Sequence, residues 1–262
     1  MTETPTVLIT GASSGIGAAY AERFARRGQD LVLVARNQAR LEALSARLHE
    51  ETGVTVDILP ADVTNSDELA VVETRLRDDH RIGILVNNAG ASLRGTFADQ
   101  AANDVAQLIA LNATAVARLA SAVAPRLIEA GSGAIVNVSS VVGLAPEFGM
   151  SVYGATKAFV TFLSQGLSLE LGPKGIYVQA VLPAATRTEL WELVGIDVNT
   201  LPAVMEVGEL VDAALAGFDR REGVTIPPLH DAAQWEAYHA ARQTMIPGFA
   251  QGRAAERYRT AR

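Results

Sequence analysis

Short apolar runs alternate with longer amphipathic segments through the first 182 residues, and this alternation restricts the possible folds more than any other feature. The runs are apolar throughout, as in strands buried on both faces of a sheet. Strands that alternate with helices form βαβ units, so we expect an α/β fold around a parallel sheet. The expected strands are residues 6–10, 31–35, 54–59, 82–87, 134–139 and 176–182, with a last strand at 223–227. The expected helices are residues 15–28, 37–52, 65–79, 99–130, 151–172 and 206–220.

Glycine and asparagine mark several of the expected helix ends. Gly28, Gly53 and Gly131 stand where left-handed C-caps are expected. Asn65 suits an N-cap, and Glu68 three residues later predicts a capping box. Because the alternation runs on without a linker or an internal repeat, we expect residues 1–262 to form a single domain. The alternation of apolar runs and amphipathic segments becomes less regular after residue 182. Residues 230–262 are expected to form a helical C-terminal extension.

Composition excludes several classes of function. Apolar residues make up 49% of the chain and charged residues 19%, as in a compact globular protein. The net charge of −7 argues against nucleic acid or an anionic membrane as the main partner. The sequence contains no cysteine and no metal-ligand spacing of its four histidines, so we expect no metal site. With no signal sequence and no run of about 18 apolar residues, we expect a cytoplasmic protein without a membrane helix.

A glycine cluster follows the first expected strand, in TVLITGASSGIG. Gly11, Gly15 and Gly17 allow a tight turn and let a ligand approach the main chain closely. The helix that begins behind them offers free N–H groups to phosphate. The spacing differs from the usual dinucleotide fingerprint, and a plain strand-to-helix turn is the alternative. Its place directly after the first strand favours phosphate binding.

The second strand ends in LVLVARN, where an NAD-binding unit carries an acidic residue for the ribose hydroxyl. Ala35 and Arg36 stand there instead. An arginine suits a 2′-phosphate, so we expect the cofactor NADP(H). A solvated surface arginine is the alternative.

Two further strand ends carry polar groups. Asp62 follows the third strand and is placed to bond an adenine amino group. NNAG, residues 87–90, ends the fourth. Asn87 is expected to tie neighbouring strands, while Asn88, Ala89 and Gly90 let the loop lie against the cofactor.

The chemical group is expected after the fifth strand. Tyr153 lies 13 residues after Ser140, and Lys157 lies one helical turn after Tyr153 in YGATK. A nearby ammonium lowers the pKa of a phenol, so that it can exchange a proton with a carbonyl or an alcohol. Ser140 is expected to hold the same oxygen. Asn112 is a polar residue in the apolar stretch LIALNATA, and it fits either this site or a satisfied core position.

TGASSGIG, NNAG, the internal Asn112, Ser140 and YGATK together resemble the short-chain dehydrogenase/reductase family over about residues 5–190. The resemblance implies a single dinucleotide-binding catalytic domain with a Rossmann-like, doubly wound parallel sheet of order 3-2-1-4-5-6-7. It implies Tyr153 as general acid/base, Lys157 on the nicotinamide ribose and Ser140 on the substrate carbonyl. Asn112 would hold a water that links Lys157 to solvent. The expected cofactor contacts are Gly11, Ser13, Ser14, Gly15, Ile16, Gly17, Arg36, Asp62, Val63, Asn88, Ala89, Gly90, Tyr153, Lys157, Pro183 and Thr188.

Two departures from the family pattern are visible. Pro183-Ala184 replaces the family's Pro-Gly, and TIPPL with a tail of about thirty residues replaces a glycine-rich ending. This ending is similar to that of a subgroup of bacterial reductases.

The substrate is expected to be an aldehyde, ketone or alcohol with hydrocarbon parts. Residues 187–220 are expected to cover it, and apolar side chains from two loops predict an apolar pocket. These are Leu190, Trp191, Leu193, Val194, Leu201 and Met205, with Val141, Val142, Leu144 and Phe148. Arg94 and Arg187 either meet an anionic substrate or are solvated.

Two other functions fit the same fold, namely an NADP(H) sensor or scaffold and a sugar-nucleotide epimerase or dehydratase. The intact Ser140, Tyr153 and Lys157 argue against the first, and a length of 262 residues leaves little room for the second. The resemblance also implies a homotetramer or homodimer, with the helices at 99–130 and 151–172 in the interface.

Overall fold

The computed structural model describes residues 4–193 and 195–259. Val194 and the side chain of Leu193, both expected in the apolar cover, lie outside this description. The chain divides into two compact units, Met1–Pro227 and Pro228–Arg262, which are described separately below.

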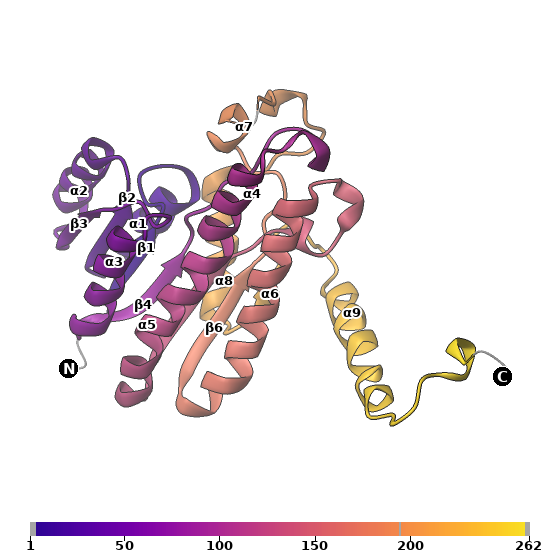
Figure 1. The fold of residues 1–262 in the computed structure, drawn as a ribbon. Coiled ribbons are helices and arrows are strands. Elements are labelled where there is room, and N and C mark those ends of the chain that lie inside the picture. Colours follow the sequence, from indigo (N-terminus) through magenta and orange to yellow (C-terminus); the bar gives the residue numbers. More distant parts are fainter. Residues whose placement is uncertain (1–3, 194, 260–262) are drawn as a thin grey trace. The chain divides into compact units, whose positions relative to one another are not determined.

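The described residues of the first unit form a seven-stranded parallel sheet of order β3-β2-β1-β4-β5-β6-β7 (Figure 1). This confirms the expected Rossmann-like class and strand order. The strands are β1 Thr6–Thr10, β2 Leu31–Ala35, β3 Val56–Pro60, β4 Ile82–Asn87, β5 Gly133–Val138, β6 Ile176–Val181 and β7 Val224–Thr225. The central strands β1 and β2 are buried along their whole length, whereas β3 at the edge is only partly buried, as its position requires.

Helices cover both faces of the sheet and bury two separate apolar layers. Alternate residues of β1 point to opposite faces, so Val7 and Ile9 join one layer and Leu8 the other. One layer is closed by α1, α2 and α8, and the other mainly by α3 and α5. The bounds are α1 Gly15–Arg26, α2 Gln38–Thr52, α3 Ser66–Asp78, α4 Ala102–Ile109, α5 Ala115–Ala130, α6 Ser151–Leu171, α7 Leu190–Leu193 and α8 Val207–Asp219.

Most of the expected helix ends are confirmed, with one correction. Gly53 and Gly131 are left-handed C-caps with φ of +76° and +64°, and Gly28 has φ of +77° just after α1. The Asn65 side chain accepts hydrogen bonds from the N–H groups of Asp67 and Glu68. The capping box does not form, because the Glu68 carboxylate accepts instead from the N–H of Asp62.

The helix expected at 99–130 is interrupted near its middle. Residues Ala110–Thr114 form a π turn between α4 and α5, and Asn112 lies inside it. Within the described part of the chain, Ala102–Ala130 is the one helix long and apolar enough to cross a membrane by length and composition. Half of its most apolar window is buried in the protein, and the core helix of a globular protein passes the same test.

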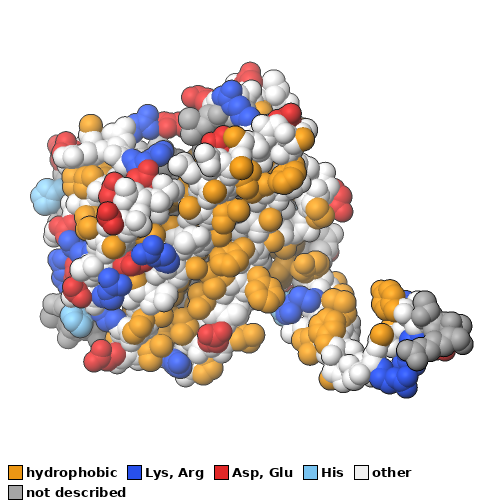
Figure 2. Space-filling view, viewed as in Figure 1, with side chains coloured by type: hydrophobic (Ala, Val, Ile, Leu, Met, Phe, Trp, Pro, Cys, Tyr) orange, Lys and Arg blue, Asp and Glu red, His pale blue; other side chains and the backbone are white. Residues whose placement is uncertain are grey.

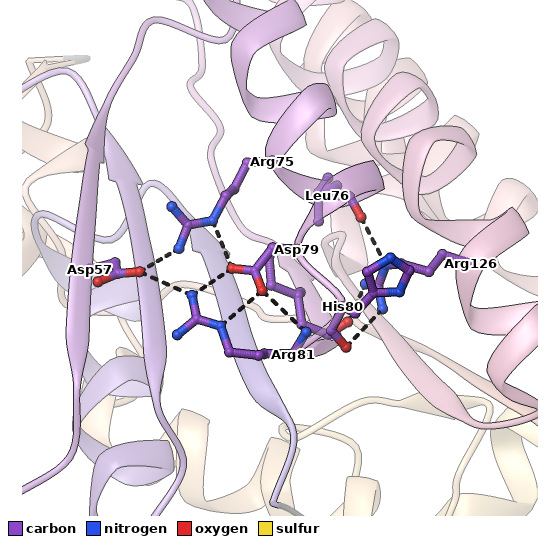
Figure 3. Close-up of polar contacts among 8 residues, drawn as sticks. Asp57, Arg75, Leu76, Asp79, His80, Arg81 and Arg126 are labelled. Carbon is purple, nitrogen blue, oxygen red and sulfur yellow. Dashed lines mark hydrogen bonds and ion pairs between the residues drawn. The ribbon is translucent and has the colours of Figure 1, made fainter.

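A cluster of ion pairs lies at the edge of the sheet where β4 begins (Figure 3). Asp57 of β3 pairs with Arg75 and Arg81, and Asp79 accepts hydrogen bonds from both arginines. The buried Arg126 of α5 donates to the carbonyl oxygens of Leu76, His80 and Ile82, so it caps the end of α3 and the loop behind it.

Residues 185–206 form a loop that is closed at its base. Thr186 and Met205 form a bridge, and the N–H of Arg187 donates to the Met205 carbonyl oxygen at 3.0 Å. The loop carries α7 and a short 3-10 turn at Val198–Thr200, and α8 follows it. Its expected role as the cover of a substrate stays a prediction.

The second unit contains α9, Ala232–Thr244, and two 3-10 turns at Ile246–Phe249 and Glu256–Tyr258. Trp235 and Tyr238 stack in α9 with ring centroids 5.5 Å apart. The expectation of a helical extension at 230–262 therefore agrees with the described part of this unit.

Candidate active site

The carboxyl ends of four strands bring the expected site residues to one edge of the sheet. Gly11 follows β1, Asn88 follows β4, Ser140 follows β5 and Pro183 follows β6. In open parallel sheets, this edge is where ligands bind. These residues are up to 172 positions apart in the sequence, and the parallel strand order brings them to the same edge of the sheet.

The glycines of the first turn are required by the packing of the chain itself. A Cβ on Gly17 would lie 2.3 Å from the Gly11 carbonyl oxygen, and one on Gly11 would lie 2.8 Å from the Asn88 Nδ2. Gly15 has φ of +54°, which side chains rarely adopt. In the described part of the chain, no side chain caps the start of α1, so its first N–H groups remain available to phosphate. The structure therefore confirms the tight strand-to-helix turn, and phosphate binding at this turn stays a prediction.

Thr10 and Asn88 fix the first turn against the end of β4. The Thr10 hydroxyl accepts hydrogen bonds from the N–H groups of Asn88 at 3.0 Å and Ala89 at 3.1 Å. The Asn88 amide donates in return to the carbonyl oxygens of Thr10 and Gly11. Thr10 was not among the expected site residues, although a hydroxyl at the end of an apolar strand was a visible signal. Asn87 does tie neighbouring strands as expected, since its amide donates to the Asn137 Oδ1 at 2.9 Å.

Arg36 and Asp62 form a polar pair at the ends of β2 and β3. The Arg36 guanidinium is 79% exposed and lies 3.8 Å from the Asp62 carboxylate. The other Asp62 oxygen accepts from the N–H and the hydroxyl of Thr64, which fixes its position. Burial raises the pKa of the Asp62 carboxyl, but these hydrogen bonds and the Arg36 charge outweigh burial and lower it. An exposed guanidinium here fits a phosphate on the adenosine ribose.

Lys157 is a buried cation that donates a hydrogen bond to a neutral acceptor. Its side chain lies in α6, is 5% exposed, and donates to the Val138 carbonyl oxygen at 2.9 Å. Burial lowers its pKa to about 8, because the ammonium loses hydration. An ammonium has three donors, so further donors can meet ribose hydroxyls. The β4–α4 loop passes near Lys157 at Gly90, where a Cβ would lie 3.4 Å from the Lys157 Nζ.

Tyr153 stands one turn before Lys157 on the same helix. The ammonium lies 5.7 Å from the centroid of the phenol ring. Burial raises the pKa of Tyr153, and a hydrogen bond with Ser140 opposes this without reversing it. The phenol is therefore held protonated, which suits a proton donor. The expected lowering of the Tyr153 pKa by Lys157 does not dominate in this geometry.

Ser140 is positioned by backbone groups of its own loop and of β6. Its hydroxyl donates to the Pro183 carbonyl oxygen at 3.2 Å and accepts from the Val142 N–H at 3.2 Å. The neighbouring Ser139 hydroxyl instead donates to the Lys157 carbonyl oxygen at 2.7 Å. The first serine of the pair therefore anchors α6, and the second faces Tyr153.

Asn112 links the π turn between α4 and α5 to α6. It is fully buried; its Oδ1 accepts from the Ala91 N–H, and its Nδ2 donates to the Ala91 carbonyl oxygen and the Thr156 hydroxyl. The π turn projects it toward α6 and the β4–α4 loop. Both sequence readings of Asn112 thus have support, since it is a satisfied core residue beside Lys157. Thr156 was missed, although it stands inside the YGATK motif that drew attention.

Thr188, another of the expected cofactor contacts, lies near the base of the closed loop. The Thr188 Cγ2 would lie 3.3 Å from a Cβ on Gly15, so this threonine packs over the glycine turn. Arg187 pairs with Glu206 at 2.8 Å and donates to Asn199, within the loop region. The Arg94 guanidinium donates to the Glu192 carbonyl oxygen at 3.2 Å.

A Rossmann-like sheet with a glycine turn after one strand, and a serine, tyrosine and lysine gathered after another, defines a dinucleotide-dependent oxidoreductase. The chain belongs to the short chain dehydrogenase family, whose sequence model matches residues 5–198. This confirms the family resemblance noted in the sequence.

Solved structures and curated proteins give particular relatives. A short-chain dehydrogenase from Sphingobium yanoikuyae in complex with NADPH is 68% identical, with a TM-score of 0.96 covering 97% of this chain and 100% of that chain. The bulky-bulky ketone specific alcohol dehydrogenase from Comamonas testosteroni is 61% identical, with a TM-score of 0.93 covering 99% and 100%. The very-long-chain 3-oxoacyl-CoA reductase of Bos taurus is 38% identical over 187 residues, 70% of this chain. The chain matches only 60% of the length of that curated protein.

Proposed function

We propose that this protein is an NADP(H)-dependent reductase that interconverts ketones or aldehydes with their alcohols. The observation that carries the proposal is the meeting of Ser140, Tyr153 and Lys157 beside the glycine turn. The NADPH complex of the relative that is 68% identical and the ketone specificity of the relative that is 61% identical support it.

The residues at the strand ends fit the cofactor. The start of α1 offers N–H groups to its pyrophosphate, Arg36 offers a guanidinium to its 2′-phosphate, and Lys157 offers donors to its nicotinamide ribose. When bound, the cofactor supplies the hydride that reduces the carbonyl carbon.

Tyr153 supplies the proton in this mechanism. Its hydroxyl gives the proton to the carbonyl oxygen as the C–O double bond becomes single. The single O–H of Ser140 turns from the Pro183 carbonyl oxygen and donates a hydrogen bond to the same substrate oxygen. The phenolate left behind lies near the Lys157 ammonium, which stabilises the negative charge. In alcohol oxidation, the phenolate takes the proton back. Asn112 keeps the loop at Ala91 and the Thr156 hydroxyl in place beside Lys157, and its proposed role in a water relay extends this path to solvent.

The proposed substrate class rests on the apolar side chains of two loops. Val141, Val142 and Leu144 follow the serine, and Trp191 lies on the closed loop. These apolar side chains favour a ketone with hydrocarbon groups on both sides of the carbonyl. Because Arg187 is already paired with Glu206, an anionic substrate is not favoured. We propose that residues 187–220 cover this substrate and that residues 1–262 form one catalytic chain.

A homodimer or homotetramer in the cytoplasm completes the proposal. Figure 2 shows hydrophobic side chains gathered over α5 and α6. On α6, Phe162 is 72% exposed and Leu169 80% exposed, and such side chains favour burial between subunits. Light scattering of the wild type and of a Phe162→Glu variant tests this interface.

A screen of NADPH oxidation over ketones of increasing bulk tests the function. We expect turnover of ketones with two large groups, a preference for NADPH over NADH, and loss of turnover in Tyr153→Phe. Turnover that Tyr153→Phe retains in full would refute the mechanism. NADPH binding without turnover of any carbonyl would favour a sensor.

A further inference from the structure

We propose that Arg40 and Glu189 form a latch between α2 and the closed loop, and that the 2′-phosphate of NADP(H) releases it by taking Arg40 from Glu189. Arg40 is then a second residue that determines cofactor specificity, and Glu189 positions the loop. This inference rests on the proposed NADP(H) function of the same site.

The latch is an ion pair between distant parts of the chain. One Arg40 nitrogen, Nη1, lies 3.0 Å and 2.8 Å from the two carboxylate oxygens of Glu189, which is 149 residues away. The two side chains are 50% and 52% exposed. Exposed ion pairs are weak, so a competing anion can displace this carboxylate.

The loop that carries Glu189 contacts two parts of the proposed cofactor site, the turn expected to hold the pyrophosphate and the start of α2 near the expected 2′-phosphate. Thr188 packs over Gly15, in the first turn, where the pyrophosphate is expected. Glu189 is the next residue. Its partner Arg40 is the third residue of α2, just after the β2–α2 turn that carries Arg36. The latch therefore ties the base of the loop to the start of α2, four residues after Arg36.

The charge of a 2′-phosphate explains why it should take Arg40 from Glu189 as well as bind Arg36. A phosphate monoester carries about −1.5 to −2 at neutral pH, so Arg36 alone does not balance it. Arg36 lies near Asp62, whose carboxylate is fixed by Thr64. Arg40 is the next cation along the chain, only four residues further, and its carboxylate stands on a loop rather than on the sheet edge. Phosphate binding attracts Arg40 and repels Glu189, and both effects open the latch.

The consequence is that the two cofactors act differently on the loop. NADP(H) binding releases Glu189, whereas NAD(H), which lacks the phosphate, leaves the ion pair closed. Arg40 thus favours NADP(H) directly, and Glu189 lowers the affinity for it by competition. Removing the Glu189 charge should therefore strengthen NADPH binding, which is the reverse of what loss of a cofactor contact would do.

Trp191 makes the loop visible to fluorescence. It lies two residues after Glu189, and its indole N–H donates to the Thr186 carbonyl oxygen at 2.7 Å. The chain has two tryptophans, so a Trp235→Phe background leaves Trp191 as the sole reporter. Adenosine 2′,5′-bisphosphate carries the 2′-phosphate without the nicotinamide, and 5′-AMP is its matched control.

Titration of the Trp235→Phe protein with the two nucleotides tests the latch. We expect adenosine 2′,5′-bisphosphate to change Trp191 emission and 5′-AMP to leave it unchanged at saturation. Measured by isothermal titration calorimetry, which also detects 5′-AMP, Glu189→Gln should bind the bisphosphate about twofold to fivefold more tightly, with unchanged affinity for 5′-AMP. Arg40→Gln should bind the bisphosphate more weakly. Arg47→Gln, on the same helix and also paired with carboxylates, is the control for loss of an arginine and should bind as the parent does.

The outcomes separate the latch from the proposed function. Wild-type protein that fails to bind NADPH refutes the function and the latch together. If NADPH binds but Glu189→Gln shows equal or weaker affinity for the bisphosphate, the latch alone is refuted. An equal effect of Arg47→Gln and Arg40→Gln would show that overall charge, and not Arg40, is responsible.

Discussion

The edge of the sheet where the strands begin and the edge where they end carry charged residues in opposite arrangements. At the edge where β4 begins, Asp57, Arg75, Asp79 and Arg81 pair with one another (Figure 3). At the edge where β5 ends, the buried Lys157 donates to a neutral acceptor, the Val138 carbonyl oxygen. The first arrangement holds the chain together, since each charge has a partner.

The second arrangement opposes folding, because burial penalises the ammonium and lowers its pKa to about 8. Charges that are left without a counter-ion in a buried site mark places where structure is arranged for chemistry. A substitution at the first edge should therefore change stability and spare turnover. A substitution at the second edge should lower turnover strongly without lowering stability.

Tyr153→Phe should show the largest difference between loss of turnover and loss of stability. The variant loses one hydroxyl and keeps the ring, so its melting temperature should stay close to that of the wild type. Turnover should fall by about 10²–10⁴ because the general acid is gone. Steady-state kinetics and thermal unfolding on the same preparation check both halves, with NADPH affinity as the control for an intact cofactor site. A large fall in melting temperature would show that Tyr153 is also a folding residue.

Most element bounds were predictable because local pattern determines them, whereas the strand order followed from the family resemblance. Buried parallel strands need apolar runs, and glycines such as Gly53 mark helix ends by their left-handed backbone. Turn glycines, Ser140, Tyr153 and Lys157 could be found in the same way, since their chemistry depends on residue type and spacing.

Side-chain partners from distant segments could not be predicted in this way. Glu68 stands at the capping-box position, yet it bonds the Asp62 N–H because the chain folds back at that point. Asn112 required a π turn that no propensity signals. The pair of Arg40 and Glu189 joins two exposed residues that, in the sequence, look like ordinary solvated charges.

Arg126→Met should have the next largest effect, with the opposite signature. Methionine fills much of the volume but leaves the Leu76, His80 and Ile82 carbonyl oxygens without their donor. We expect a loss of about 2–3 kcal/mol in the free energy of unfolding, measured by urea denaturation. The kcat per folded molecule should not change. A fall in kcat at full stability would contradict the division between the two edges.

Lys157→Met should stabilise the folded protein while it abolishes turnover. The folded pKa of about 8 lies below the usual 10.5, so the unfolded chain binds the proton more tightly, and stability rises as pH increases from about 8 to 10.5. Below that range, the buried charge lowers stability, and its removal should outweigh the lost bond to Val138. We expect a gain of about 1–2 kcal/mol at pH 7.

The pH dependence provides the control for that gain. The wild-type curve should approach that of Lys157→Met as pH rises toward 10, because the folded protein then buries a neutral lysine rather than an ammonium. A variant less stable than the wild type at pH 7 would show that Lys157 also contributes to folding.

Arg81→Gln should have the smallest effect, and its pH dependence tests the paired edge directly. The hydrogen bond from Arg81 is the main cause that lowers the pKa of Asp79 from 3.8 to about 2. The depressed pKa contributes stability that is fully present above about pH 4 and is lost as pH falls through 2. Because Arg81 is half-exposed and Asp79 keeps Arg75, we expect a loss below about 1 kcal/mol at pH 7. The difference from the wild type should shrink below pH 4 and in high salt, as followed by thermal unfolding. A difference that is constant from pH 7 to pH 2 would mean that Arg81 acts through packing rather than through its charge.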